Sequence, residues 1–136
     1  MLMETVIKCL KNDKFARGAG IELVEVSPGH ALVRMTLEPC HHNGIGLAHG
    51  GAIFTLADFA FAAASNSYGT VAVAVNVSIT FLKATTTGTL QAEAKEVSKS
   101  HRLGTYSIQV TDQQGDLVAL FVGTAYRKPD PLPTLP

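Results

Sequence analysis

One charged residue stands inside the longest apolar stretch of the sequence. Asp58 interrupts the run 52–64, whose other members are apolar or small except for Thr55. Aspartate is almost never fully buried unless it is paired or has a task. Either a hydroxyl such as that of Thr55 satisfies a structural carboxylate, or Asp58 is a nucleophile or general base tuned by burial. Because burying an unpaired charge is costly, the second interpretation is favoured.

A second candidate lies where this stretch begins. His49-Gly50-Gly51 opens a predicted helix from about Gly50 to about Ser67, since helix formers fill it without an interior glycine or proline. The first N–H groups of a helix have no internal partner, and glycine lets a ligand approach them. Gly50 could thus stabilise an oxyanion, such as one developing on a thioester carbonyl. Equally, the two glycines could serve a tight turn or close packing.

Gly50 and Asp58 cannot reach the same carbonyl carbon within one chain. Eight residues separate them, which is about 12 Å along a helix. If both act on one substrate, they come from two subunits whose helices lie side by side and antiparallel. That mechanism requires a homodimer with two identical shared sites.

The polar loop before the helix, residues 39–48, adds further candidates. The Asn43 side-chain amide could hydrogen-bond a carbonyl or a water, although Asn-Gly is also a common turn pair. His49 is expected to hydrogen-bond backbone near the helix start. The Cys-His-His run at 40–42 fits no standard zinc spacing, so we expect no metal.

The remaining segments predict a sheet that holds this helix. A short amphipathic helix is expected over residues 3–12, and a connector over 15–18. Strands are predicted over 21–26, 31–37, 71–81, 90–97, 106–111 and 117–125. The order lacks the strand–helix alternation of a parallel sheet. We therefore expect an α+β fold, in which about six antiparallel strands wrap around one long central helix that is buried on all sides.

Composition limits the partners and the compartment. The 136 residues are 46% hydrophobic and carry no formal net charge. Without a Lys/Arg run, nucleic acid is not an expected partner; the apolar run falls short of the roughly 20 residues of a membrane span. No signal peptide is visible, and two cysteines without CxxC spacing predict a cytoplasmic protein. One domain is expected over 1–127, with a proline-rich disordered tail over 128–136.

In combination, these motifs resemble the hot-dog thioesterases, and among them the PaaI type, named for phenylacetic acid degradation. The segments that carry the resemblance are Asn43, His49-Gly50-Gly51, Leu56-Ala57-Asp58, the strand 71–81 and the closing strand 118–124. The resemblance implies a hot-dog fold and hydrolysis of acyl-CoA by a homotetramer built as a dimer of dimers. It also implies an aromatic acyl group, such as phenylacetyl, and no cofactor, since coenzyme A is part of the substrate.

The resemblance also implies residue roles. Asp58 would activate water or attack the thioester directly, Gly50 would supply the oxyanion N–H, and Asn43 would orient the thioester or water. The expected substrate-binding residues are His49, Gly51, Asn76, Lys83, His101 and Arg102. Asn76 stands near the place where some relatives carry a water-holding hydroxyl. The cations, together with Lys99, are candidates for the phosphates of coenzyme A, although each could instead be a solvated charge.

Two other functions remain open. A hot-dog dehydratase acting on 3-hydroxyacyl thioesters would use His49 and Asp58 as an acid–base pair, but the usual proline-containing motif of that family is missing. A non-catalytic acyl-CoA-binding protein would bind the ligand without hydrolysis. The joint presence of Asp58, Gly50 and Asn43 favours the thioesterase over this binding protein.

Overall fold

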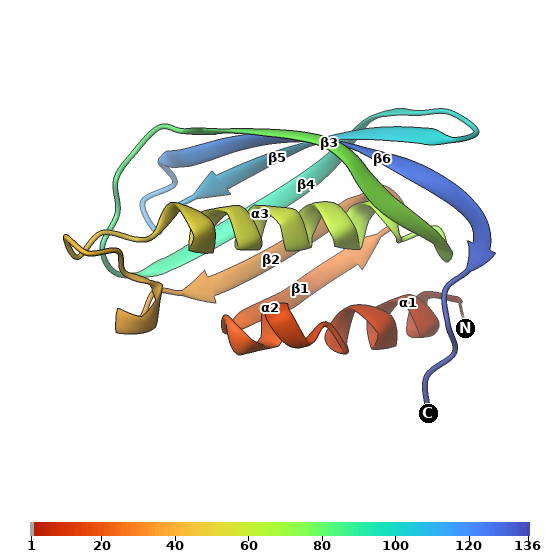
Figure 1. Ribbon diagram of the computed structural model, residues 1–136, viewed down its shortest axis with the longest axis horizontal. Coiled ribbons are helices and arrows are strands. Elements are labelled where there is room, and N and C mark those ends of the chain that lie inside the picture. Colours follow the sequence, from red (N-terminus) through yellow and green to blue (C-terminus); the bar gives the residue numbers. More distant parts are fainter. Residues whose placement is uncertain (1) are drawn as a thin grey trace.

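The computed structural model describes residues 2–136 and contains three α-helices, one 3-10 turn and six strands (Figure 1). In chain order the elements are α1 (Leu2–Lys11), α2 (Lys14–Gly18), β1 (Ile21–Ser27), β2 (His30–Thr36), the 3-10 turn Pro39–His41, α3 (Gly50–Ser65), β3 (Thr70–Phe81), β4 (Thr89–Lys99), β5 (Leu103–Thr111) and β6 (Leu117–Pro131).

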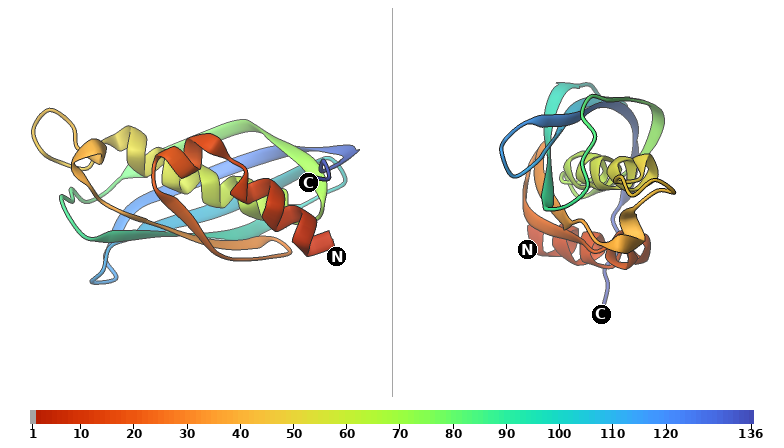
Figure 2. Two further views of the ribbon diagram at one scale, coloured as in Figure 1. Left: turned by 90° about the horizontal axis from the view of Figure 1, so that it is seen from below. Right: turned by 90° about the vertical axis from the view of Figure 1, so that its left-hand side faces the viewer.

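All six strands form one sheet in the order β1-β2-β4-β5-β6-β3, and every neighbouring pair is antiparallel. The sheet curves around α3, which lies along its concave face, and α1 and α2 lie beside β1 (Figures 1 and 2). The predicted α+β fold, a six-stranded antiparallel sheet around one long helix, is confirmed. Within the described chain, no helix has both the length and the apolar character needed to cross a membrane.

Aromatic side chains fix α3 against the sheet. The Phe61 ring packs between Tyr106 of β5 and Phe121 of β6, with centroid separations of 5.9 and 5.6 Å. Phe54, nearly two turns earlier, also packs against Phe121, with a centroid separation of 5.5 Å. Tilted and edge-on aromatic pairs add to the stabilisation from burial alone. This packing sets the rotation of α3 about its axis and hence the direction in which its polar residues point.

The expectation that α3 is buried on all sides is wrong for the single chain. Leu56 and Ala57 are fully buried, but Gly51 is exposed and Thr55, Asp58 and Ala62 are only half-buried. These four lie three or four residues apart, so they form one stripe along the helix. The sheet covers most of the opposite side of α3 and leaves this stripe, hereafter the open stripe, without full cover.

Strand β3 is an edge strand and is largely exposed. Its alternating valines predicted a strand, and two of them, Val73 and Val75, are 47% and 57% exposed. A register shift between Ala74 and Asn76 also interrupts its pairing with β6. A long edge strand offers unpaired backbone N–H and C=O groups and is a template for pairing with another chain. The period-2 pattern therefore identified the strand correctly but not its environment.

Several predicted boundaries differ from the structure. The segment 15–18, expected to be a connector, lies in the short helix α2, which Asp13 caps by accepting a hydrogen bond from the N–H of Ala16 (2.9 Å). Residues 128–131, assigned to a disordered tail, continue β6 instead, where Pro131 pairs with Thr70. The N–H of Leu132 then donates to Gly69 O (2.9 Å). Proline is tolerated at the end of this strand because it lacks only the backbone N–H donor and keeps its carbonyl acceptor.

Candidate functional site

The first turn of α3 presents a backbone N–H toward a cavity. His49 caps the helix, because its Nδ1 accepts a hydrogen bond from the N–H of Gly51 (2.8 Å). The N–H of Gly50, by contrast, has no hydrogen-bond acceptor within residues 2–136. Gly50 lines a cavity of about 310 Å³ together with Asn43, Phe81 and Lys83. An unpaired N–H at a helix N-terminus that lines a cavity can donate a hydrogen bond to a developing negative charge.

Asn43 shapes the loop that leads to this turn. Its side-chain oxygen accepts hydrogen bonds from the N–H groups of Ile45 and Leu47, both at 3.0 Å. These bonds orient the side chain and leave the donor NH₂ group without a hydrogen-bond acceptor in the described chain. The turn role and the binding role considered for Asn43 are thus compatible, because they use different atoms of one amide.

A second segment, residues 82–88, holds the loop in place. The carbonyl of Thr85 accepts from the N–H of Ala48 (2.8 Å), and the carbonyl of Thr86 hydrogen-bonds with His42 Nε2 (2.7 Å). Lys83 anchors this segment, since its Nζ bonds to Asp112 (2.5 Å) and Asp116 (2.8 Å) in the β5–β6 turn. Lys83 therefore lines the Gly50 cavity with its ammonium already paired to two carboxylates.

Asp58 lies midway along α3, on the open stripe. Burial raises the pKa of its carboxyl group, and the charge of nearby Asp13 raises that pKa further. Thr55, the proposed structural partner, instead donates its hydroxyl to Gly51 O (2.7 Å). In the described chain, no hydrogen bond or ion pair satisfies the Asp58 carboxylate. A partly desolvated carboxyl with a raised pKa and no structural partner is suited to proton transfer.

The structure does not bring Asp58 to Gly50 within the chain. Both lie on the same straight helix, eight residues and about 12 Å apart, and Asp58 is absent from the lining of the Gly50 cavity. Asn43, Gly50 and Lys83 are brought together, and His49 and Gly51 adjoin them at the helix start. The carboxylate is the one predicted catalytic group that stands apart.

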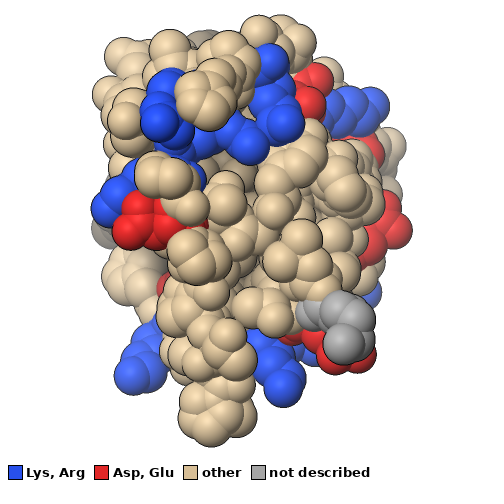
Figure 3. All heavy atoms as spheres, turned by 90° about the vertical axis from the view of Figure 1, so that its right-hand side faces the viewer, with Lys and Arg blue, Asp and Glu red and all other residues tan. Residues whose placement is uncertain are grey.

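The other predicted cations gather at the far end of α3. Lys99 ends β4, His101 and Arg102 form the exposed β4–β5 turn, and Arg102 O accepts from the N–H of Arg127 (2.6 Å). Figure 3 shows Lys and Arg side chains collected on this end of the molecule, and Figure 1 shows it opposite the start of α3.

Lys99 and a further cation, Arg127, contact the same aromatic ring. Lys99 and Arg127 lie over the ring of Tyr68, at 4.3 and 4.9 Å from its centroid. The Arg127 Nε and Nη1 atoms are buried and have no hydrogen-bond partner in the described chain. Sequence reasoning missed Arg127, because β-sheet register rather than chain proximity brings it beside Lys99 and Arg102. Its position directly after the apolar part of the last strand was the only local signal.

Asn76 lies apart from both groups. It is exposed on β3 and pairs in register with Thr124 of β6, next to the irregularity at Val75. No side-chain hydrogen bond of Asn76 is found in the described chain. Its amide is therefore open to solvent in the single chain.

Comparisons with known proteins identify the family and the fold. The model of the Thioesterase superfamily matches residues 45–119. The acyl-coenzyme A thioesterase PaaI of Escherichia coli is 41% identical over 118 residues, covering 86% of this chain and 84% of that protein. The solved structure of E. coli PaaI, from the phenylacetic acid degradation operon, superposes with a TM-score of 0.91, covering 96% and 95% of the two chains at 37% identity.

Two further solved structures are similar. A mutant of the phenylacetic acid degradation protein PaaI from Thermus thermophilus has a TM-score of 0.82 at 38% identity, covering 85% of this chain and all of its own. A hypothetical thioesterase of Streptococcus pneumoniae, solved with coenzyme A, has a TM-score of 0.83 at 25% identity, covering 90% and 96% of the two chains.

Proposed function

This chain belongs to the thioesterase superfamily and is a thioester hydrolase, and from this premise we propose that it hydrolyses acyl-CoA to a free acid and coenzyme A. The observation that carries the proposal is the division of its catalytic groups between the start and the middle of one helix. Gly50 offers an unpaired N–H to a cavity, and Asp58 offers a carboxyl of raised pKa about 12 Å away.

The proposed active enzyme is a homodimer. A second copy would cover the open stripe of α3 and the exposed edge of β3, which are adjacent features left uncovered in one chain. Antiparallel packing of two α3 helices would place Asp58 of each chain beside Gly50 of the other, giving two equal sites. We extend this dimer to a homotetramer and place it in the cytoplasm, in keeping with the resemblance and with the free thiols of Cys9 and Cys40.

In each proposed site the thioester carbonyl oxygen accepts the N–H of Gly50, and the Asn43 NH₂ group hydrogen-bonds the same oxygen or the attacking water. Asp58 from the other subunit takes a proton from that water, whose oxygen attacks the carbonyl carbon, or Asp58 attacks that carbon itself. The tetrahedral oxyanion collapses, the C–S bond breaks, and the thiolate of coenzyme A leaves and takes up a proton. The first route gives the free acid at once, whereas the second leaves an acyl–Asp58 anhydride that water hydrolyses to release the acid and restore the carboxylate. Fixed donors aimed at the developing charge provide the largest part of such catalysis.

Substrate binding extends from this centre in both directions. We assign the phosphates of coenzyme A to the cluster around Lys99, His101 and Arg102, which lies beyond Asp58 toward the C-terminal end of α3. We assign Lys83 to holding the Gly50 cavity rather than to a phosphate, because its ammonium already meets two carboxylates. His49, Gly51 and Asn76 would contact the pantetheine arm or ordered water.

The acyl group is proposed to be aromatic, of the phenylacetyl type. Support comes from the two PaaI relatives, whose names associate them with phenylacetic acid degradation. The Gly50 cavity, lined in part by Phe81, has about 310 Å³, which is at the small end of ligand pockets.

Thiol release from a panel of aromatic and aliphatic acyl-CoA esters tests the proposal, with Asp58→Asn measured beside the wild type. Release by the wild type alone, fastest with aromatic esters, is the expected result. Hydration of an enoyl-CoA without thiol release would instead assign the dehydratase reaction. Tight binding of the esters with neither reaction would assign a binding protein.

A further inference from the structure

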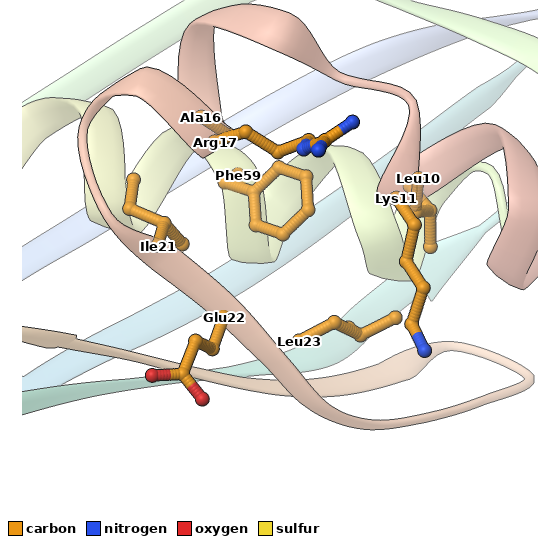
Figure 4. A pocket seen from close by; sticks show the side chains of 8 residues that line it. All are labelled: Leu10, Lys11, Ala16, Arg17, Ile21, Glu22, Leu23 and Phe59. Atoms are coloured by element: carbon orange, nitrogen blue, oxygen red, sulfur yellow. The ribbon is translucent and has the colours of Figure 1, made fainter.

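A second cavity lies under the N-terminal helices, away from the catalytic groups. It has about 490 Å³ and is bounded by the end of α1, by α2, by the start of β1 and by one residue of α3 (Figure 4). Its apolar lining consists of Leu10, Ala16, Ile21, Leu23 and Phe59. Figure 4 shows the Phe59 ring in the middle of this space. The volume is that of a small-molecule site, and its accessible lining is about equally polar and apolar.

The rim of this cavity carries an unbalanced positive charge. Lys11 and Arg17 line it, and within residues 2–136 neither has a carboxylate within 4.0 Å. In the view of Figure 4 the Arg17 side chain runs along one edge of the lining residues and the Lys11 side chain along another. Glu22 also lines the cavity, but it points away from it in Figure 4 and pairs with Arg34 at 3.1 Å. The rim therefore presents two free cations and one carboxylate that is already engaged.

We propose that this cavity binds a small carboxylic acid with an apolar body, either an aryl-acetic or a short fatty acid. The apolar body would pack on Phe59, Ile21 and Leu23, because removing apolar surface from water is favourable. The carboxylate would bind Arg17 and Lys11, because charge-assisted pairs with a guanidinium or ammonium are the strong hydrogen bonds of proteins. A neutral ligand would leave this charged rim without a partner.

The site is separate from the one proposed for catalysis. Asn43, Gly50 and Asp58 do not line it. Phe59 follows Asp58 on α3, and Asp13, whose charge acts on Asp58, lies in the link between the two helices that cover the cavity. An acid bound there would brace the α1–α2 corner beside the carboxylate. Only the choice of carboxylic acids as the ligand class rests on the proposed function, since such acids are the products of the proposed hydrolysis.

Calorimetric titration of the whole protein with phenylacetate and with hexanoate tests the proposal directly. Neither probe can be hydrolysed, so a result is independent of whether the protein is a thioesterase. Both acids are expected to bind, and their amides, phenylacetamide and hexanamide, are expected to bind at least about tenfold more weakly. Saturating free coenzyme A is expected to leave acid binding unchanged, because the catalytic groups lie outside the cavity.

Variants identify the site. The double change Arg17→Gln and Lys11→Gln should weaken acid binding at least about tenfold, and because both side chains are exposed the fold should persist. Lys14→Gln is the matched control, since Lys14 is an exposed cation of α2 outside this cavity. Leu23→Phe should reduce binding of acid and amide alike by filling the space.

Four outcomes would overturn the proposal. These are no acid binding at millimolar concentration, equal binding of acids and amides, full binding by the Arg17/Lys11 double variant, and displacement of the acid by free coenzyme A. The last result would place the acid in the catalytic site instead.

Discussion

Two inactive variants of this chain are expected to restore one another. Gly50→Pro removes the N–H assigned to the oxyanion, and Asp58→Asn removes the carboxylate. Proline suits the first position of a helix, and His49 has φ −64° and ψ 135°, which is the backbone conformation favoured before proline. Gly50→Ala is the matched control, because a Cβ at this position lies 3.3 Å from Phe81 Cζ in either variant, yet alanine keeps the N–H.

Because about 12 Å separates the two groups on one helix, each active site takes Gly50 from one subunit and Asp58 from the other, and this division sets the activity expected of mixed dimers. Loss of an oxyanion donor costs about 10²–10³ in kcat, and loss of a general base about 10²–10⁴. In a mixed dimer, one site combines both defects and the other combines an intact Gly50 with an intact Asp58. Equal co-expression makes about half of the dimers mixed, each with one good site of two. The mixture should therefore show about a quarter of wild-type activity.

Thiol release per mole of protein, after co-expression with two different affinity tags, provides the assay. Dimers purified through both tags should reach about half of wild-type activity, while each variant alone stays at its low level. If mixed dimers remain as inactive as their parents, the site is not shared between subunits and the reasoning from helix geometry fails. If Gly50→Ala loses as much activity as Gly50→Pro, the N–H is not the group that matters.

Three further predictions concern the charges around the site. Burial raises the pKa of Asp58, so ionisation of this carboxyl destabilises the native state at neutral pH. Asp58→Asn should therefore raise Tm at neutral pH, and this gain should vanish below the ordinary aspartate pKa of about 3.9, where the carboxyl is protonated in both the native and the unfolded state. Asp13→Asn removes a charge that raises the pKa of Asp58 but retains a good helix cap, so the acidic limb of the kcat/KM profile should move to lower pH; an unchanged limb would show that Asp58 is not the titrating base. Lys83→Met should lower kcat with little effect on KM, because it releases segment 82–88, which supports the Gly50 cavity. Lys83→Arg should restore kcat. A rise in KM alone would instead assign Lys83 to the binding of coenzyme A.

Local patterns predicted much of this fold. The central helix was located to within two residues at its C-terminal end, and all six strands were found, because apolar periodicity and turn residues act over short distances. The helix-start glycine and the capping role of His49 followed from the same local rules. The missed features are the short helix α2 and the continuation of β6 through residues 128–131, where tertiary contacts override weak or proline-rich local signals.

The sequence by itself determined which chemical groups this protein has and how far apart they lie on one helix, because residue type and helical rise are local properties. Only the tertiary structure decided which groups meet. It joined Asn43 to the Gly50 cavity, paired Lys83 with two aspartates and brought Arg127 beside Lys99. It also showed that the Asp58 side of α3 and much of β3 stay uncovered. Strand register and side-chain packing join residues far apart in the chain, and no local pattern encodes them.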